Sequence, residues 1–184
     1  MPLPPDLLRK RVRNEIENAR RDLREHKVEV MGDQKAFPLM VKVTIYGIPG
    51  PDIVDGKVVH RTEHIFLMEI SEDYPYKKPL VIWGSPIFHP NIMLPEDGGF
   101  VCTKLLDDWS FDSNLLLFIK GIEVLVSSPN PSSPYGTDSC TRAAQIFNRE
   151  PYIPPGGAIM SNAPAKKRPL LLGKSKPKVI TRKE

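Results

Sequence analysis

Apolar residues recur at helical spacing near the start of the chain. The stripe is formed by positions separated by four, four, three and four residues: Leu8, Val12, Ile16, Ala19 and Leu23. Spacings of three and four place side chains on one face of a helix. The pattern therefore predicts an amphipathic helix over residues 6–25, with Asp6 as its N-cap or as an acid in its first turn.

Beyond this helix the pattern changes to alternation of apolar and polar residues, which is typical of strands with one buried face. Four segments show it: 28–30, 39–46, 60–70 and 80–83. The glycines and prolines of 47–52, with Asp55-Gly56 beyond them, predict a broad hairpin loop between the second and third segments. Sequential strands with hairpin connections predict a four-stranded antiparallel meander packed on the first helix.

After Trp83 the alternation stops, and prolines follow at positions 86, 90 and 95. Gly98-Gly99 then permits a turn shortly before the first cysteine of the chain. A long loop of this kind inside a compact domain is usually functional. We therefore expect the segment to be an active-site loop.

Two further helices are predicted beyond the loop. Residues 115–126 are apolar almost all round, which predicts a buried central helix with Asp112 or Ser113 as its cap. Residues 137–149 predict a short C-terminal helix, after which prolines and glycines end helical structure. Together the elements predict an α+β fold: an N-terminal helix, a four-stranded meander, an active-site loop, a buried central helix and a short last helix.

The net charge of +4 is unevenly distributed along the chain. Residues 165–184 hold eight basic residues and one acid and so carry +7, which leaves −3 on the rest. We therefore predict one domain over residues 1–150 and a Pro-rich, basic, mobile tail over 151–184. Because the basic excess belongs to the tail, a nucleic-acid-binding face on the folded domain is not expected.

Composition limits the cellular setting and the chemistry. No run approaches the roughly 18 apolar residues of a membrane span, and no secretory signal is visible at the N-terminus. Cys102 and Cys140 are too few for a disulfide scaffold, so we expect a reducing, cytoplasmic compartment. A disulfide between these two cysteines remains the alternative. No metal site and no cofactor are expected.

Cys102 lies between the turn His89-Pro90-Asn91 and Trp109. A thiolate attacks acyl groups well, and the thioester it forms stays reactive toward amines. Taken alone, however, a free cysteine is more often a small buried core residue. Cys140, among the packing residues of the predicted last helix, is assigned that core role.

The order of these features resembles the ubiquitin-conjugating enzyme family. The shared order is helix, four-stranded meander, Tyr-Pro-aromatic (Tyr74), His-Pro-Asn (His89), cysteine, Trp-Ser (Trp109), apolar helix, Pro-Asn-Pro (Pro129) and short helix. The resemblance covers residues 6–150. It implies a UBC-like fold and an enzyme that takes ubiquitin or a ubiquitin-like protein from an activating enzyme. The enzyme passes this protein to a lysine of a substrate protein, usually with a RING-type ligase.

The resemblance also implies roles for single residues. Cys102 is the thioester-forming nucleophile. Asn91 stabilises the oxyanion when lysine attacks, by its side-chain amide or by holding the loop, although a turn asparagine is the alternative. Ser133 lies where the family often has an acid or a serine near the incoming lysine, and it can orient an amine but cannot accept a proton efficiently. His89 is expected to pin the loop rather than to act as a base.

The resemblance places a partner-binding surface on the first helix and on two loops. Its residues are Lys10, Arg11, Asn14, Tyr76, Phe111 and Asp112. An exposed aromatic pair beside basic residues suits a binding hot spot for activating enzyme and ligase. The alternative for Tyr76 and Phe111 is that both are half-buried loop anchors.

Several features depart from the family pattern. The loop from Asn91 to Cys102 is longer than usual, and Lys104 stands where an acid often follows the cysteine, which favours thiolate. The family's further C-terminal helix has no counterpart in this sequence. These departures indicate a divergent member, from an archaeal or bacterial ubiquitin-like system. Two rival hypotheses remain: a catalytically idle UBC-like binding module, and a nucleic-acid-associated protein acting through its tail.

Overall fold

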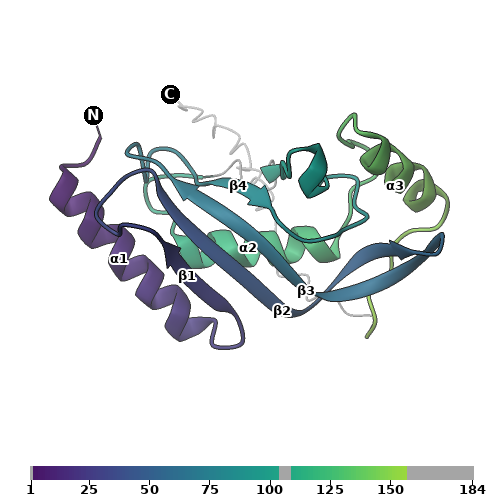
Figure 1. Ribbon diagram of the computed structural model, residues 1–184, viewed down its shortest axis with the longest axis horizontal. Coiled ribbons are helices and arrows are strands. Elements are labelled where there is room, and N and C mark those ends of the chain that lie inside the picture. Colours follow the sequence, from purple (N-terminus) through teal and green to yellow (C-terminus); the bar gives the residue numbers. More distant parts are fainter. Residues whose placement is uncertain (1, 104–108, 157–184) are drawn as a thin grey trace, which may run out of the picture.

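The computed structural model describes residues 2–103 and 109–156. Three α-helices, a short 3-10 helix (η1, Pro95–Asp97) and a four-stranded sheet are the regular elements of this part of the chain (Figure 1). The elements are α1 (Pro5–Asp22), β1 (Lys27–Met31), β2 (Leu39–Val54), β3 (Lys57–Ile70), β4 (Leu80–Trp83), α2 (Leu115–Ser127) and α3 (Asp138–Arg149). The predicted α+β architecture is confirmed. The predictions for the basic tail fall almost entirely outside the described residues.

The sheet is an antiparallel meander in the order β1-β2-β3-β4. Apolar residues that alternate along the strands, such as Val43 on β2 and Phe66 on β3, are opposite each other in the register and fully buried. α2 packs on this face along β2, and α1 packs against α2 and β1 (Figure 1). The core of the domain therefore lies between the sheet and these two helices.

The apolar stripe of α1 faces the core as predicted. Leu8, Val12, Ile16 and Ala19 are its buried residues. Asp6 is an acid in the first turn, where it pairs with Arg9, and makes no cap. The helix ends at Asp22 rather than at residue 25, because the chain must turn before β1.

The predicted hairpin loop over 47–52 is wrong. β2 continues through this segment, with an irregular register against β3 between Tyr46 and Gly50. Such an irregularity lets a strand absorb glycine and proline without ending. The turn lies at Asp55-Gly56, where both residues have positive φ (51° and 74°), as a two-residue hairpin turn requires.

α2 is capped by Asn114 rather than by Asp112 or Ser113. The Asn114 side chain accepts a hydrogen bond from the Leu117 N–H at 3.0 Å. One face of the helix is buried in the core, whereas Leu117 and Val124 are 58% and 50% exposed. The expectation of a helix buried all round is therefore wrong for one side.

α3 belongs to a second apolar cluster at the far end of the domain. Phe147 packs edge-on against Phe88, and Tyr152 packs on Phe147 and on His60 of β3. The Tyr152 hydroxyl and His60 Nδ1 are 2.9 Å apart. The segment after α3 thus packs against the β2–β3 hairpin, whose tip lies beside α3 (Figure 1).

Across the described ranges, no helix is both long enough and apolar enough to cross a membrane.

Candidate functional site

His89 fixes the loop that precedes the cysteine. Its side chain is fully buried; Nε2 donates to the Leu125 carbonyl at 3.0 Å, and Nδ1 accepts from the Asn91 N–H at 3.0 Å. Burial lowers the pKa of His89 to about 3. A neutral imidazole with both nitrogens bonded inside the protein joins the loop to α2 and is not available as a base.

Asn91 links two loops through its side chain and is only 3% exposed. Its amide nitrogen donates to the carbonyls of Asn130 and Ser133, both at 3.0 Å. Its amide oxygen accepts from the Asn130 N–H at 2.7 Å. Both amide hydrogens are engaged within the protein, so these contacts are those of a positioning residue. The oxyanion role of Asn91 stays a prediction.

Cys102 is anchored through its backbone and partly exposed through its side chain. Its N–H donates to the Asn91 carbonyl at 2.9 Å. The residue lines a cleft of about 290 Å³, whose other lining residues are Lys78, Val101, Thr103, Ser133, Pro134 and Tyr135. An accessible sulfur on a fixed backbone is the arrangement that a nucleophile needs.

Cys140 has a different environment. It is fully buried, its Sγ lies 3.4 Å from the Ile92 carbonyl, and burial raises the pKa of its thiol. Neither Cys140 nor Cys102 forms a disulfide. Cys140 is therefore a packing residue, as the sequence predicts.

The rim of the cleft contains residues that the sequence patterns did not single out. Tyr135 is held by its N–H, which donates to the Pro90 carbonyl at 2.9 Å, and burial raises the pKa of its phenol. Lys78 Nζ donates to the Thr103 carbonyl at 3.1 Å, one residue beyond the cysteine. No spacing rule connects either residue to Cys102, because both reach the cleft through tertiary structure. Ser133 is exposed at the same rim, as its predicted role requires.

The longer loop before Cys102 folds back on itself. Ile92 and Val101 form an antiparallel bridge, and the Met93 N–H donates to the Phe100 carbonyl at 2.9 Å. Gly99 has φ +66° and lies so close to Trp83 that a Cβ would be 2.6 Å from its carbonyl oxygen. Only glycine therefore fits at position 99. Residues 95–98 are exposed, and Cys102 stays bonded to Asn91. Lys104 lies outside the described residues.

The predicted partner-binding surface contains a real aromatic pair. Tyr76 and Phe111 are 53% and 45% exposed, and their ring centroids are 5.5 Å apart. Lys10, Asn14 and Asp112 are also exposed. The rings lie on the two loops that the sequence predicted to meet.

The Arg11 side chain is bonded to neighbouring residues rather than free in solvent. Its guanidinium lies 4.7 Å from the centroid of the Phe111 ring and donates to the carbonyls of Phe111 (2.6 Å) and Ser113 (3.0 Å). It also pairs with Glu15 at 2.8 Å. Direct contact of Arg11 with a partner stays a prediction, whereas its hold on the Phe111 loop is visible.

Glu15 is a structural hub that the sequence did not reveal. One carboxylate oxygen accepts from the Leu115 N–H at the start of α2 (2.9 Å) and from the Tyr74 hydroxyl. Burial and the adjacent carboxylate raise the pKa of Tyr74. Trp109 completes the junction by donating from Nε1 to the Pro75 carbonyl at 2.6 Å. The two loops that carry Tyr76 and Phe111 are therefore tied to α1 and to each other.

Within residues 2–103 and 109–156, no three His, Cys, Asp or Glu side chains gather as metal ligands would.

Comparisons with known proteins all point to one family. Residues 10–152 match the family model described as ubiquitin-conjugating enzyme. A probable ubiquitin-conjugating enzyme E2 of Acanthamoeba polyphaga mimivirus is 37% identical over 73 residues, which are 39% of this chain and 44% of that protein. The NEDD8-conjugating enzyme UBC12 of Saccharomyces cerevisiae is 30% identical over 128 residues, 61% of this chain and 66% of that protein.

Structural comparison agrees with the sequence comparison. The solved structure of S. cerevisiae Ubc12 superposes with a TM-score of 0.58 at 26% identity, covering 77% of this chain and 69% of that chain. The alignments to the two curated relatives span less than half of the first and about two thirds of the second.

Proposed function

The chain belongs to the ubiquitin-conjugating enzyme family, and we propose that it carries ubiquitin or a ubiquitin-like protein on Cys102. An activating enzyme supplies the modifier, and a lysine amine of a substrate protein receives it, usually with help from a RING-type ligase. Relatives named for ubiquitin and for NEDD8 both match the chain. The experiment below therefore tests several modifiers.

The observation that carries this proposal is the setting of Cys102. Its side chain is partly exposed in a cleft, its backbone is bonded to Asn91, and the other cysteine, Cys140, is fully buried. A packing cysteine needs neither a cleft nor access to solvent. This difference between the two cysteines favours Cys102 as the nucleophile.

The proposed chemistry is two acyl transfers. In the first, the Cys102 thiolate bonds to the carbonyl carbon of the modifier's C-terminus and displaces the thiol of the activating enzyme. In the second, a lysine nitrogen bonds to the same carbon, the carbon–sulfur bond breaks, and Cys102 leaves as thiolate. The amine proton passes to solvent, since the neighbouring His89 is buried, neutral and bonded on both nitrogens.

The rim of the cleft suits an incoming lysine. Ser133 and Tyr135 offer hydroxyl groups there, and Tyr135 adds an aromatic ring along which an aliphatic stem can pack. Partial desolvation of an ammonium favours its neutral, nucleophilic form. Asn91 holds this rim in a fixed position relative to Cys102, because its amide donates to the carbonyls of Asn130 and Ser133.

We assign ligase contact to the exposed Tyr76–Phe111 pair. Aromatic side chains at the centre of an interface often contribute most of its binding free energy. The contacts of Arg11 with Phe111 and Ser113 hold this pair in a fixed position before any partner binds. Preorganised side chains lose less conformational entropy on binding.

A catalytically idle binding module on the same fold is the alternative function. Such a module has no use for an accessible cysteine in a cleft beside Ser133 and Tyr135. The position of Cys102 therefore favours the carrier over the scaffold.

Incubation with an activating enzyme, ATP and a panel of modifiers tests the proposal. The adduct should appear on non-reducing gels, disappear on reducing gels, and persist in Cys140→Ser. Cys102→Ser should give a reductant-stable oxyester or no adduct. A reducible adduct on Cys102→Ala, or none on the wild-type chain with any modifier, contradicts the assignment.

A further inference from the structure

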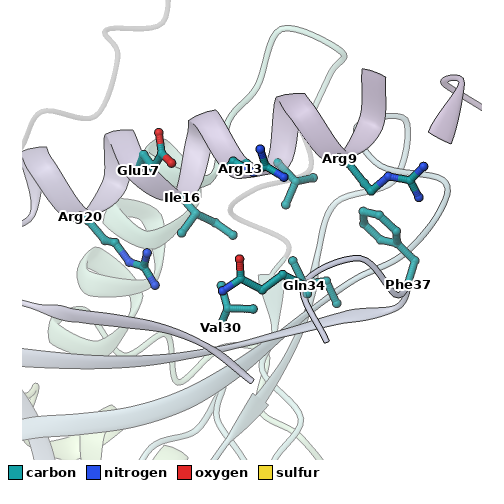
Figure 2. Close-up of a pocket in the computed structure, with 10 residues that line it drawn as sticks. Arg9, Arg13, Ile16, Glu17, Arg20, Val30, Gln34 and Phe37 are labelled. Atoms are coloured by element: carbon teal, nitrogen blue, oxygen red, sulfur yellow. The ribbon is translucent and has the colours of Figure 1, made fainter. Parts of the chain in front are cut away.

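A small hollow lies between α1 and the start of the sheet, away from the cysteine cleft (Figure 2). Its floor is mostly apolar and includes Ile16 of α1, Val30 of β1 and Phe37 of the β1–β2 connection. Three arginines of α1 form its rim: Arg9, Arg13 and Arg20. We call these six residues the α1–β1 pocket.

The rim has an excess of positive charge. Arg9 is paired with Asp6 at 2.7 Å, and Arg20 donates from Nε to the Val28 carbonyl at 2.8 Å. The guanidinium of Arg13 makes no ion pair or hydrogen bond within the part of the chain that the structure describes. Glu17 also lines the pocket, but its carboxylate points away from the floor (Figure 2). An anionic ligand would therefore meet the guanidinium of Arg13 and those of Arg9 and Arg20, with the carboxylate of Asp6 on Arg9 and that of Glu17 directed away. The uncharged amide of Gln34 also lies in the pocket (Figure 2).

The size of the hollow limits what can enter it. Its volume is about 90 Å³, below the roughly 150 Å³ of a cavity that accommodates a benzene ring. One aliphatic side chain suits this space better than a ring system does. An apolar floor under a charged rim thus fits a single apolar anchor flanked by acidic groups.

The length of the rim favours a peptide over a small metabolite. Arg9 and Arg20 are eleven residues apart on one helix, which corresponds to about 16 Å at 1.5 Å per residue. An extended segment of five residues covers about the same distance at roughly 3.3 Å per residue. In such a segment every second side chain faces the same way, so an apolar residue and the acids two positions either side can all face the pocket.

The pocket lies on a different side of α1 from the partner-binding surface. Arg9, Arg13 and Arg20 are spaced by four and seven residues and share one side of the helix, whereas Lys10 and Asn14 lie about a quarter turn further round. The chain's own basic segment, residues 165–184, has the wrong charge to occupy the pocket. A partner here would not need to displace one on the Tyr76–Phe111 surface.

We infer that the α1–β1 pocket docks an extended acidic segment of a partner protein, with one leucine-like side chain in the hollow and carboxylates on the rim arginines. This inference goes beyond the proposed function and does not depend on Cys102 chemistry. It adds a second recognition site through which the enzyme can be brought to a substrate or regulator.

In the test, the peptide Glu-Ser-Leu-Ser-Glu, acetylated at its N-terminus and amidated at its C-terminus, is titrated into the full-length chain, and binding is followed by NMR. Shifts should concentrate on Ile16, Val30 and Phe37. Replacing the peptide's leucine by alanine should weaken binding about tenfold through lost apolar burial. Arg13→Glu should weaken it about fivefold or more, whereas Arg21→Glu, an exposed control on the same helix outside the pocket, should change it less than twofold.

Three results overturn the inference. Equal affinity for the leucine and alanine peptides would mean that attraction is only electrostatic, without an anchor. Equal weakening by Arg13→Glu and Arg21→Glu would mean that the whole helix, rather than the pocket, attracts the peptide. Inhibition of Cys102 charging by saturating peptide would make the pocket part of the activating enzyme's contact rather than a separate site. The two affinity comparisons need no modifier, so they still test the inference if Cys102 is never charged.

Discussion

Asn91 shows how much one side chain contributes beside the Cys102 cleft. Its single amide group makes three hydrogen bonds to the segment from Asn130 to Ser133, and its backbone carbonyl accepts from Cys102. Cys102, the proposed nucleophile, and the segment that carries Ser133 are therefore held by the same residue. A loss of either the oxyanion donor or the loop geometry would slow transfer to lysine.

Replacement of Asn91 by alanine should separate stability from chemistry. Three hydrogen bonds at roughly 1 kcal/mol each predict a fall of about 2–3 kcal/mol in the free energy of unfolding. Charging of Cys102 should persist, whereas discharge onto free lysine should slow about a hundredfold if an oxyanion donor is lost. Urea denaturation and single-turnover discharge measure the two effects. Unchanged stability would contradict the positioning role, and unchanged discharge would leave Asn91 without a part in transfer.

His89 gives the protein a specific sensitivity to acid. Burial lowers its pKa from 6.5 to about 3, so between these values the unfolded chain binds one more proton than the folded chain. Stability must then fall as pH decreases below about 6.5, by up to about 1.4 kcal/mol per pH unit. His64, whose pKa burial also lowers, adds to the slope.

Urea denaturation between about pH 7 and pH 5 tests this slope. His89→Gln keeps a hydrogen-bond donor but does not titrate, so its stability should be lower at neutral pH and should depend less on pH. An exposed control, His60→Gln, should leave most of the slope in place. If His89→Gln and the wild-type chain lose stability in parallel as the pH falls, His89 is not the group whose protonation destabilises the folded state.

At the residue scale, the sequence singled out residues that belong to a local motif and missed residues whose contacts are long-range. Cys102 and Asn91 are part of a local pattern of cysteine, proline turn and tryptophan. Glu15 and Tyr135, by contrast, acquire their roles from residues far away in sequence, such as Leu115 and Cys102. Periodicity identifies which side of a helix is buried but not which buried carboxylate binds the end of another helix.

Among elements, the two loops that carry Tyr76 and Phe111 depend on α1. Glu15 joins α1 to the start of α2 and to Tyr74, and Arg11 holds the carbonyls of Phe111 and Ser113. These bonds give the exposed Tyr76–Phe111 pair a fixed geometry. The sequence predicted the meeting of the loops through a family resemblance but gave no physical cause for it.

Phe111→Ala should abolish ligase stimulation without changing uncatalysed discharge onto lysine. An aromatic anchor that becomes buried on binding contributes about 2 kcal/mol or more, so truncation should weaken ligase binding more than tenfold. The measurement is discharge of preloaded enzyme with and without a RING-type ligase. Ile153→Ala, 71% exposed in the segment after α3, is the control.

Two outcomes contradict this assignment. Full ligase stimulation of Phe111→Ala would remove the aromatic pair from the interface. A parallel fall in the stimulated and uncatalysed rates would mean that Phe111 supports the fold through Arg11 rather than binding a ligase.

Errors at the element scale have local physical causes. The segment 47–52 is rich in glycine and proline, yet β2 passes through it because the register irregularity after Tyr46 absorbs the change. The cap of α2 is Asn114, one residue beyond the predicted candidates, since capping side chains of similar chemistry stand next to each other there. Composition indicates that a break or a cap is near, whereas the hydrogen bonds determine where it falls.

For the whole molecule, alternation and helical periodicity were sufficient to predict the architecture. The meander order follows from short connections between sequential strands, and the buried stripe of α1 lies where the pattern placed it. The end of the domain was harder to predict, because Tyr152 follows the last helix and a proline. Its packing on His60 and Phe147 depends on the distant β2–β3 hairpin.

Two truncations test where the domain ends. Removal of residues 157–184 should change the free energy of unfolding by no more than about 0.5 kcal/mol if, as the sequence predicts, the tail makes no packed contacts. Removal of 151–184 should cost about 1–2 kcal/mol more, because it deletes the partly buried Tyr152. Tyr152→Ala in the full chain should reproduce most of that loss. Equal stability of both truncations would confine the domain to residues 1–150.

Discharge of the loaded enzyme onto free lysine tests the central claim most directly. After charging, ATP is removed. The intact mass of the loaded enzyme is then followed over time with lysine or with an equal concentration of Nε-acetyl-lysine, whose side-chain amine is blocked. The account predicts that lysine alone accelerates loss of the modifier from Cys102, that the released modifier carries one lysine through an amide bond, and that Cys140→Ser behaves like the wild-type chain. Loss at the same rate with either compound, yielding only hydrolysed modifier, would contradict a carrier that transfers its acyl group to amines.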